Sequence, residues 1–131
     1  LNVMLTGVCR YRVIETENQD DGFVIATVDW SGFENDYNTE DVDSRDIERY
    51  KYQLRQYFDQ HRMQVDWKVL DQLPIEQVVN NLVLIVNLDI DSKQQLLESP
   101  TVTQRMALFA SLLEQQVEPI VAPTAVSQSI N

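Results

Sequence analysis

The sequence has few of the residues that build a small active site or a disulfide-stabilised fold. It contains one cysteine, one histidine and three glycines in 131 residues. A single thiol excludes an intrachain disulfide framework and a zinc site made from several cysteines. The glycines lie far apart, so the chain has no glycine-rich phosphate loop. No apolar run approaches the roughly 18 residues that a membrane-spanning helix needs. These absences exclude a spanning protein and give no motif for nucleotide binding.

Sets of residues that could carry catalysis or bind a metal are also scarce. His61 and Cys9 fall on different predicted elements, so nothing pairs them as base and nucleophile. Residues 36–41 have acidic groups at alternating positions, as a calcium loop would. However, Asp41 stands where such a loop needs glycine, and Ile47 stands where it needs a bidentate glutamate. We therefore predict no catalytic residue, no metal and no cofactor.

Basic residues are outnumbered, 10 against 21 acidic ones, which gives a net charge of −11. Between Glu15 and Glu48 there are twelve acidic residues and one basic residue, Arg45, so this segment carries the whole excess. Phosphate backbones repel such a surface, so nucleic acid is a poor partner. Two interpretations stay open for the acidic segment. It is either a solvated surface that aids solubility or a patch that attracts basic segments of a partner protein.

The first third of the chain has the pattern of β-strands. Residues 8–17 alternate between apolar and polar side chains, and residues 23–30 are rich in β-branched and aromatic ones. The turn-forming residues 18–22 between them predict a hairpin. Residues 1–6 are apolar and predict a further short strand before Gly7. Because two or three strands are marginally stable alone, we expect further strands or a cover of helices.

The pattern changes to a helical period after the loop that contains Gly32. A first helix should begin between Thr39 and Ser44 and end near His61, with its apolar residues on one stripe. Asp66 should cap a short second helix. Residues 75–86 follow Pro74 and are apolar on most sides, which predicts the central helix of a bundle.

The predicted ends of the later helices follow from capping residues. Asn87 should end the central helix in a left-handed conformation, and Asp91 and Thr101 should each open a further helix. Pro119 should end the last one. The chain is therefore predicted to be α+β, with β-strands over residues 1–38, a helical bundle over 39–118 and a polar, mobile tail over 119–131.

Aromatic residues near the acidic segment suggest where a partner binds. Tyr11 and Phe23 are expected to serve the core. Three later aromatic residues and two neighbouring acids make a candidate site for extended peptide: Trp30, Phe33, Tyr37, Glu34 and Asp36.

Three segments resemble a known family in their order along the chain. Residues 5–13 read LTGVCRYRV, residues 28–31 read VDWS, and residues 91–98 read DSKQQLLE. They resemble segments of proteins with the Lon protease N-terminal, substrate-binding domain, in particular the stand-alone bacterial members. That resemblance implies a PUA-like antiparallel β-barrel followed by a helical bundle. Family members have barrel strands before the first of these segments, so the chain is expected to be the C-terminal part of such a domain.

The same resemblance implies a function. It implies a non-catalytic protein-binding module that recognises unfolded or tagged polypeptide and serves a protease system. The alternative is a structural or regulatory domain that binds one specific folded partner. With no ATPase or peptidase motif, we expect no enzyme activity. The lack of a long apolar run and the acidic charge predict no membrane partner and no nucleic-acid partner. The lone Cys9 favours the reducing cytoplasm, and the oligomeric state is left open.

Overall fold

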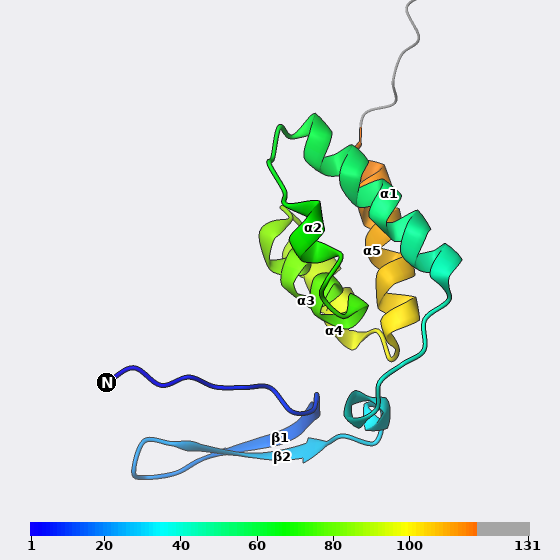
Figure 1. Cartoon of the computed structure of the whole chain (residues 1–131). Coiled ribbons are helices and arrows are strands. Elements are labelled where there is room, and N and C mark those ends of the chain that lie inside the picture. Colours follow the sequence, from blue (N-terminus) through cyan, green and yellow to red (C-terminus); the bar gives the residue numbers. More distant parts are fainter. Residues whose placement is uncertain (118–131) are drawn as a thin grey trace, which may run out of the picture.

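The computed structural model describes residues 1–117 as an antiparallel hairpin followed by helices (Figure 1). The hairpin consists of β1 (Arg12–Asn18) and β2 (Val24–Asp29), and a short 3-10 helix, η1 (Glu34–Tyr37), follows it. The helices are α1 (Ser44–Gln60), α2 (Trp67–Leu70), α3 (Ile75–Ile85), α4 (Ile90–Glu98) and α5 (Val102–Gln116). The predicted α+β class is confirmed. The tail predicted over 119–131 and the helix end predicted at Pro119 lie outside the described residues.

A tight turn and a bulge set the shape of the hairpin. The Gly22 N–H donates to the Gln19 carbonyl at 3.0 Å, and Gly22 has φ 85°, which a residue without a Cβ adopts at little cost. Further along, the pairing shifts between Val13 and Glu15, so Ile14 is an extra residue in β1. The bulge changes which side chains share a face, and the simple alternation predicted for residues 8–17 does not continue past it.

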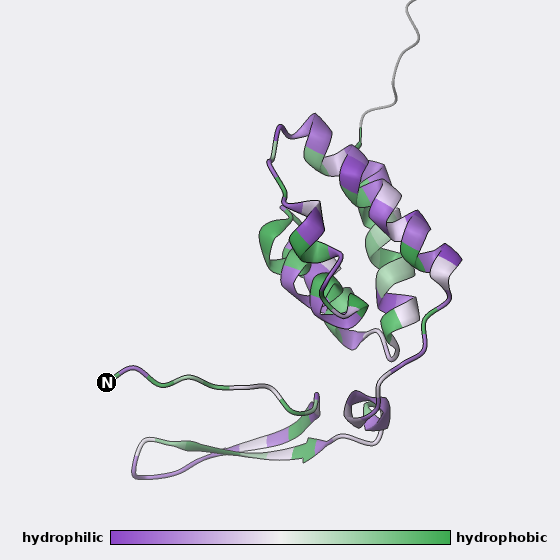
Figure 2. Cartoon of the chain, in the orientation of Figure 1, coloured by the Kyte–Doolittle hydropathy of each residue, from purple (hydrophilic) through white to green (hydrophobic). Residues whose placement is uncertain are grey.

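The strand predicted over residues 1–6 is absent. Within residues 1–117 only β1 and β2 pair, and the first eleven residues are not part of a strand. Both faces of the hairpin are exposed. In Figure 2 the apolar stretches of the hairpin, coloured green, lie outside the helical bundle. The expectation that Tyr11 and Phe23 serve the core is therefore wrong, because both are exposed.

The core lies in the helical bundle. Helix α1 runs beside α5 (Figure 1), and the rings of Tyr50 and Phe109 meet between them with centroids 5.6 Å apart. Helix α3 buries Val78, Val79 and Leu82 but leaves its last turn exposed. The prediction that residues 75–86 form the central helix is wrong, because α1 and α5 bury the larger side chains.

Most of the predicted helix starts are confirmed. Asp43 caps α1, Asp66 caps α2, and the Thr101 hydroxyl accepts from the Gln104 N–H at 3.1 Å. The cap predicted at Asp91 is wrong. Asp89 stands two residues earlier and accepts from the Ser92 N–H at 2.7 Å, so α4 begins before the predicted position.

The left-handed helix end lies on a different residue from the one predicted. Helix α3 ends at Ile85 with Val86 extended, and Asn87 is not in the left-handed region. Instead Arg62, after α1, has φ 54°. The Met63 N–H donates to the Phe58 carbonyl at 2.9 Å and the Arg62 N–H donates to Asp59, which is the Schellman pattern.

Candidate polypeptide-binding site

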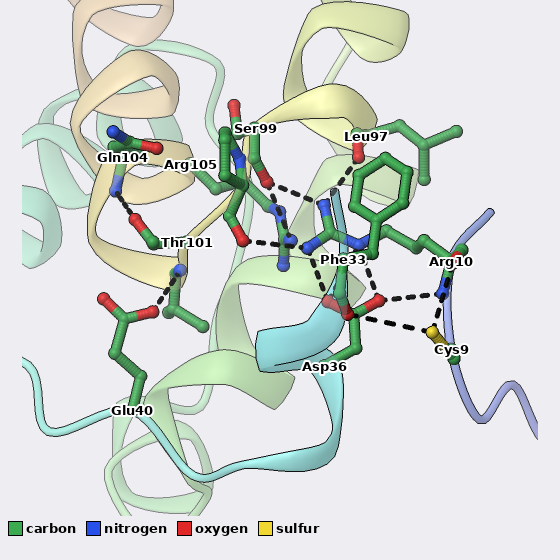
Figure 3. A network of polar contacts seen from close by, with 12 residues as sticks. Cys9, Arg10, Phe33, Asp36, Glu40, Leu97, Ser99, Thr101, Gln104 and Arg105 are labelled. Atoms are coloured by element: carbon green, nitrogen blue, oxygen red, sulfur yellow. Dashed lines mark hydrogen bonds and ion pairs between the residues drawn. The ribbon is translucent and has the colours of Figure 1, made fainter. Parts of the chain in front are cut away.

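Arg10 and Asp36 join the N-terminal segment to η1. The Arg10 guanidinium donates through Nε and Nη2 to the Asp36 carboxylate, with Nη2 to Oδ1 at 2.6 Å, and the Arg10 backbone N–H donates to the same carboxylate at 2.8 Å (Figure 3). Both side chains are largely buried. The guanidinium also lies over the Phe33 ring, 4.6 Å from its centroid. These hydrogen bonds hold the pKa of Asp36 below its usual value.

The same guanidinium reaches the helical bundle. Its Nη1 donates to the carbonyls of Leu97 and Ser99, each at 2.7 Å, and Nη2 donates to Pro100 at 3.2 Å. Carbonyls at a helix C-terminus lack partners within the helix and favour a cation. Arg10 therefore supplies hydrogen-bond donors to the carbonyl groups at and just after the end of α4. These bonds hold the N-terminal segment against the bundle.

A second arginine, Arg105, lies next to the first (Figure 3). It projects from α5 and is only 6% exposed. Its donors meet neutral acceptors: Leu96 O at 3.1 Å, Asn80 Oδ1 at 2.8 Å and Ser99 O at 3.4 Å. Burial, together with the neighbouring Arg10, lowers the pKa of Arg105. Arg105 has no direct ion pair within residues 1–117, and the carboxylates of Glu76, Asp36 and Glu40 act on its charge through longer-range electrostatic attraction.

Glu40 caps the start of α5 from a distance of more than sixty positions along the chain. Its carboxylate accepts from the Val102 N–H at 2.6 Å and from the Thr103 N–H and hydroxyl at 3.1 and 2.6 Å. Burial acts to raise the pKa of Glu40, but the hydrogen bonds from Thr103 and Val102 outweigh it and leave this pKa lowered. A helix N-terminus favours such a negative charge.

The five predicted site residues have two different environments. Phe33 is 6% exposed, and Asp36 is paired with Arg10, so both belong to the contact between hairpin and bundle. Trp30 and Tyr37 are 61% and 67% exposed, and Glu34 is exposed between them in the sequence. The structure therefore leaves three of the five residues accessible to a partner.

A groove of about 510 Å³ opens beside the arginine pair. Residues 7–10 form one wall, and α3 and α4 form the others. Helix α3 lines it with residues spaced along one face, Glu76, Asn80, Val83 and Leu84, and α4 adds Lys93, Leu96 and Leu97. Leu84 and Leu97 are 78% and 54% exposed. The groove thus has an apolar surface with charged groups at its margins.

Sequence reasoning missed the two arginines, Glu40 and the groove. One signal was available for Arg105, since it falls between Val102 and Met106 on the buried stripe of α5, where a cation is unexpected. No local signal identifies Arg10 or Glu40, because their partners are distant in sequence. Within residues 1–117 no cluster of three or more metal-ligating side chains occurs, and no helix is long and apolar enough to cross a membrane.

Comparison with known proteins gives one family. The sequence model of the ATP-dependent protease La (LON) substrate-binding domain matches residues 1–115. No curated protein and no solved structure matches the chain. The matched range includes the hairpin, η1, α1 to α4 and almost all of α5.

Proposed function

The chain belongs to the Lon substrate-binding domain family, and on this premise we propose that it is a non-catalytic module that binds unfolded or extended polypeptide for a protease system. The observation that carries the proposal is the exposed apolar surface of the N-terminal third. Large apolar side chains are exposed on residues 1–8, on both strands of the hairpin and at Trp30. Exposed apolar surface of this extent is typical of a binding site.

The hairpin also offers backbone groups. Among the described residues, β1 and β2 pair only with each other, so each strand has an outer edge. An extended polypeptide can add to such an edge through main-chain hydrogen bonds, which are independent of its sequence. A client with varied sequence suits this mode of binding.

We propose a division of work between the parts of the chain. Residues 1–38 supply recognition, through Trp30, Tyr37 and the hairpin, and residues 39–118 supply the scaffold. Of the acids near these aromatics, Asp36 and Glu40 hold the fold, whereas Glu34 and Asp41 are exposed. Glu34 and Asp41 are therefore the ones that favour basic clients. With its free Cys9 and such clients, the module is proposed to work in the cytoplasm.

The test compares how the chain binds one basic, disulfide-stabilised protein in two states. One sample of that protein is folded, and the other is unfolded by reduction of its disulfides and alkylation with iodoacetamide. Fluorescence anisotropy measures the affinity of the chain for each sample. We expect binding of the unfolded state only. Trp30→Ala should weaken it about fivefold to twentyfold, as loss of an aromatic anchor does. Tyr52→Ala, which removes an exposed aromatic side chain from α1, is the matched control.

The contribution of charge is tested separately. The pair Glu34→Gln and Asp41→Asn should weaken binding about twofold to fivefold at low salt and have little effect at high salt, because exposed charges are screened. Asp59→Asn with Glu114→Gln makes the same change of charge elsewhere on the bundle. Equal binding of folded and unfolded protein, or an unchanged affinity in Trp30→Ala, contradicts the proposal. Selective capture of one folded protein would favour the regulatory alternative.

A further inference from the structure

We propose that the groove between residues 7–10, α3 and α4 binds the C-terminal carboxylate of a client that ends in apolar residues, with Lys93 as the cation that recognises it. The inference rests on the proposed function, because it assumes that the client is a polypeptide. It goes beyond that function by naming a second contact and its chemistry.

The apolar part of the groove is the first observation. Residues Val83 and Leu84 of α3 and Leu96 and Leu97 of α4 line it. Leu84 is 78% exposed, although it follows the buried Leu82 by only two residues on α3. The neighbouring Ile85 and Ile90 are also exposed. Of the exposed residues on these two helices, Leu84 and Leu97 line the groove, one from each helix, and they make its surface apolar.

The charges at the margin are the second observation. Three cations and two carboxylates line the groove, in a chain whose net charge is −11. Arg10 is paired with Asp36. Arg105 is 6% exposed, and its guanidinium donates to the Leu96 and Ser99 carbonyls and to Asn80 Oδ1. Lys93 is the remaining cation that lines the groove.

Lys93 has no ion pair within residues 1–117. Asp89, the N-cap residue of α4, stands four residues before it, a spacing at which ion pairs form along a helix. However, both Asp89 carboxylate oxygens accept from Ser92, at 2.7 and 2.9 Å, as part of the helix cap. The half-buried Lys93 thus keeps its charge available at the edge of an apolar groove.

A carboxylate beside apolar side chains complements this arrangement. Such a group is the C-terminal carboxylate of a polypeptide that ends in apolar residues, where the carboxylate and the last apolar side chain belong to the same residue. Lys93 would attract this carboxylate, while Leu84 and Leu97 contact the apolar side chains. The acidic surface elsewhere is screened over about 8 Å at physiological salt, so it does not prevent this local contact.

The test uses the full chain and three short fluorescein-labelled peptides built on one leucine-rich sequence. The first ends in leucine with a free carboxylate, the second is its C-terminal amide, and the third is that amide with one internal leucine replaced by aspartate. We expect the free acid to bind about threefold to fivefold more tightly than the plain amide. The third peptide tests whether the carboxylate must be the chain terminus. We expect it to bind like the plain amide. If it binds like the free acid, a side-chain carboxylate suffices and the proposed occupant is wrong.

Variants assign the effect to the groove. Lys93→Gln should abolish the difference between acid and amide and leave amide binding unchanged. Lys68→Gln, which removes an exposed lysine from α2, should preserve the difference. Leu84→Ser should weaken all three peptides alike. If acid and amide bind equally well to the unmodified chain, or if Lys93→Gln keeps the difference, the groove proposal is wrong and the proposed function stands. If neither the peptides nor the unfolded protein bind, both are wrong.

Discussion

The helical bundle and the hairpin are stabilised by different interactions. In the bundle, large side chains from α1, α3 and α5 are fully buried against one another. In the hairpin, every residue of β1 is exposed, and a few polar contacts of Arg10 and Asp36 tie the N-terminal third to the bundle. Apolar burial is the main source of stability in a fold of this kind. The comparison indicates that the bundle carries the stability, while the hairpin is held in place by polar contacts and left exposed.

The largest expected effect comes from changing one aliphatic residue to aspartate in each of the two regions. Leu82→Asp buries a charge among Val78, Val79 and Val86 and should cost about 4 kcal/mol or more, enough to unfold the bundle. Ile25→Asp in the exposed β2 should change the free energy of unfolding by about 0.5 kcal/mol or less. Urea unfolding followed by circular dichroism measures both. Equal destabilisation by the two substitutions would break the comparison.

The next effect concerns the link between the regions. Asp36→Asn removes the charged partner of Arg10. It should lower the free energy needed to detach the hairpin from the bundle by about 1–3 kcal/mol. Limited proteolysis should then cleave residues 1–38 faster while the bundle stays intact. Asp59→Asn, on the exposed side of α1, is the control. An unchanged cleavage rate in Asp36→Asn would show that other contacts hold the hairpin.

The same link gives a pH dependence. Because the pKa of Asp36 is lowered in the folded state, its contribution is fully present above the unfolded value of about 3.9 and is lost as the pH falls through the folded value. Glu40 acts in the same direction through its hydrogen bonds to α5. We therefore expect the rate at which a protease cleaves residues 1–38 to increase as the pH falls through this range. The increase should be smaller in Asp36→Asn, because that variant lacks the carboxylate that is protonated.

A smaller effect tests the packing of the core. The Tyr50 hydroxyl is buried and is without a hydrogen-bond partner in the described structure, and burial raises its pKa. Tyr50→Phe should therefore stabilise the bundle by about 1 kcal/mol. Tyr57→Phe is the matched control, because the Tyr57 hydroxyl accepts from the Asn87 N–H at 3.3 Å and its loss should destabilise. Thermal unfolding shows whether each variant has a higher or a lower unfolding temperature than the unmodified chain. A lower unfolding temperature in Tyr50→Phe would mean that the Tyr50 hydroxyl has a hydrogen-bond partner.

The smallest effect lies at the end of α1. Arg62 has φ 54°, a conformation that costs an L-residue free energy and suits glycine. Arg62→Gly should stabilise the chain by about 0.5 kcal/mol, whereas Arg62→Ala should not, since alanine has the same strain. The comparison needs chemical denaturation with replicate curves. A gain from alanine as large as that from glycine would point to the arginine charge instead of the backbone.

Much of the bundle could be predicted from local sequence. Periodic apolar residues and the caps at Asp43, Asp66 and Thr101 act within a few positions, so their effect is visible along the chain. The same rules predict that Asp91 caps α4 and that Asn87 ends α3, and both predictions are wrong. Asp89 caps α4 instead, and Val86 ends α3 in an extended conformation. Local rules cannot decide between neighbouring candidates when tertiary packing fixes the helix length.

The hairpin and the site were predicted less well for a physical reason. A strand needs a partner, and the pattern of residues 1–6 does not say whether one is present. Phe33 and Trp30 look alike in the sequence, yet Arg10 covers one and the other is exposed. The contacts of Arg10, Glu40 and Arg105 join positions far apart in the chain. Such contacts follow only from the fold.

Native-state hydrogen exchange tests the central claim most directly. It measures the free energy of opening at each backbone amide. The account predicts that paired amides of β1 and β2 exchange through local opening, at a free energy well below that of the buried amides of α1 and α5. Adding an unfolded basic protein should slow exchange in the hairpin first. The account is contradicted if the hairpin amides exchange only with global unfolding, together with α5, and do not respond to the client.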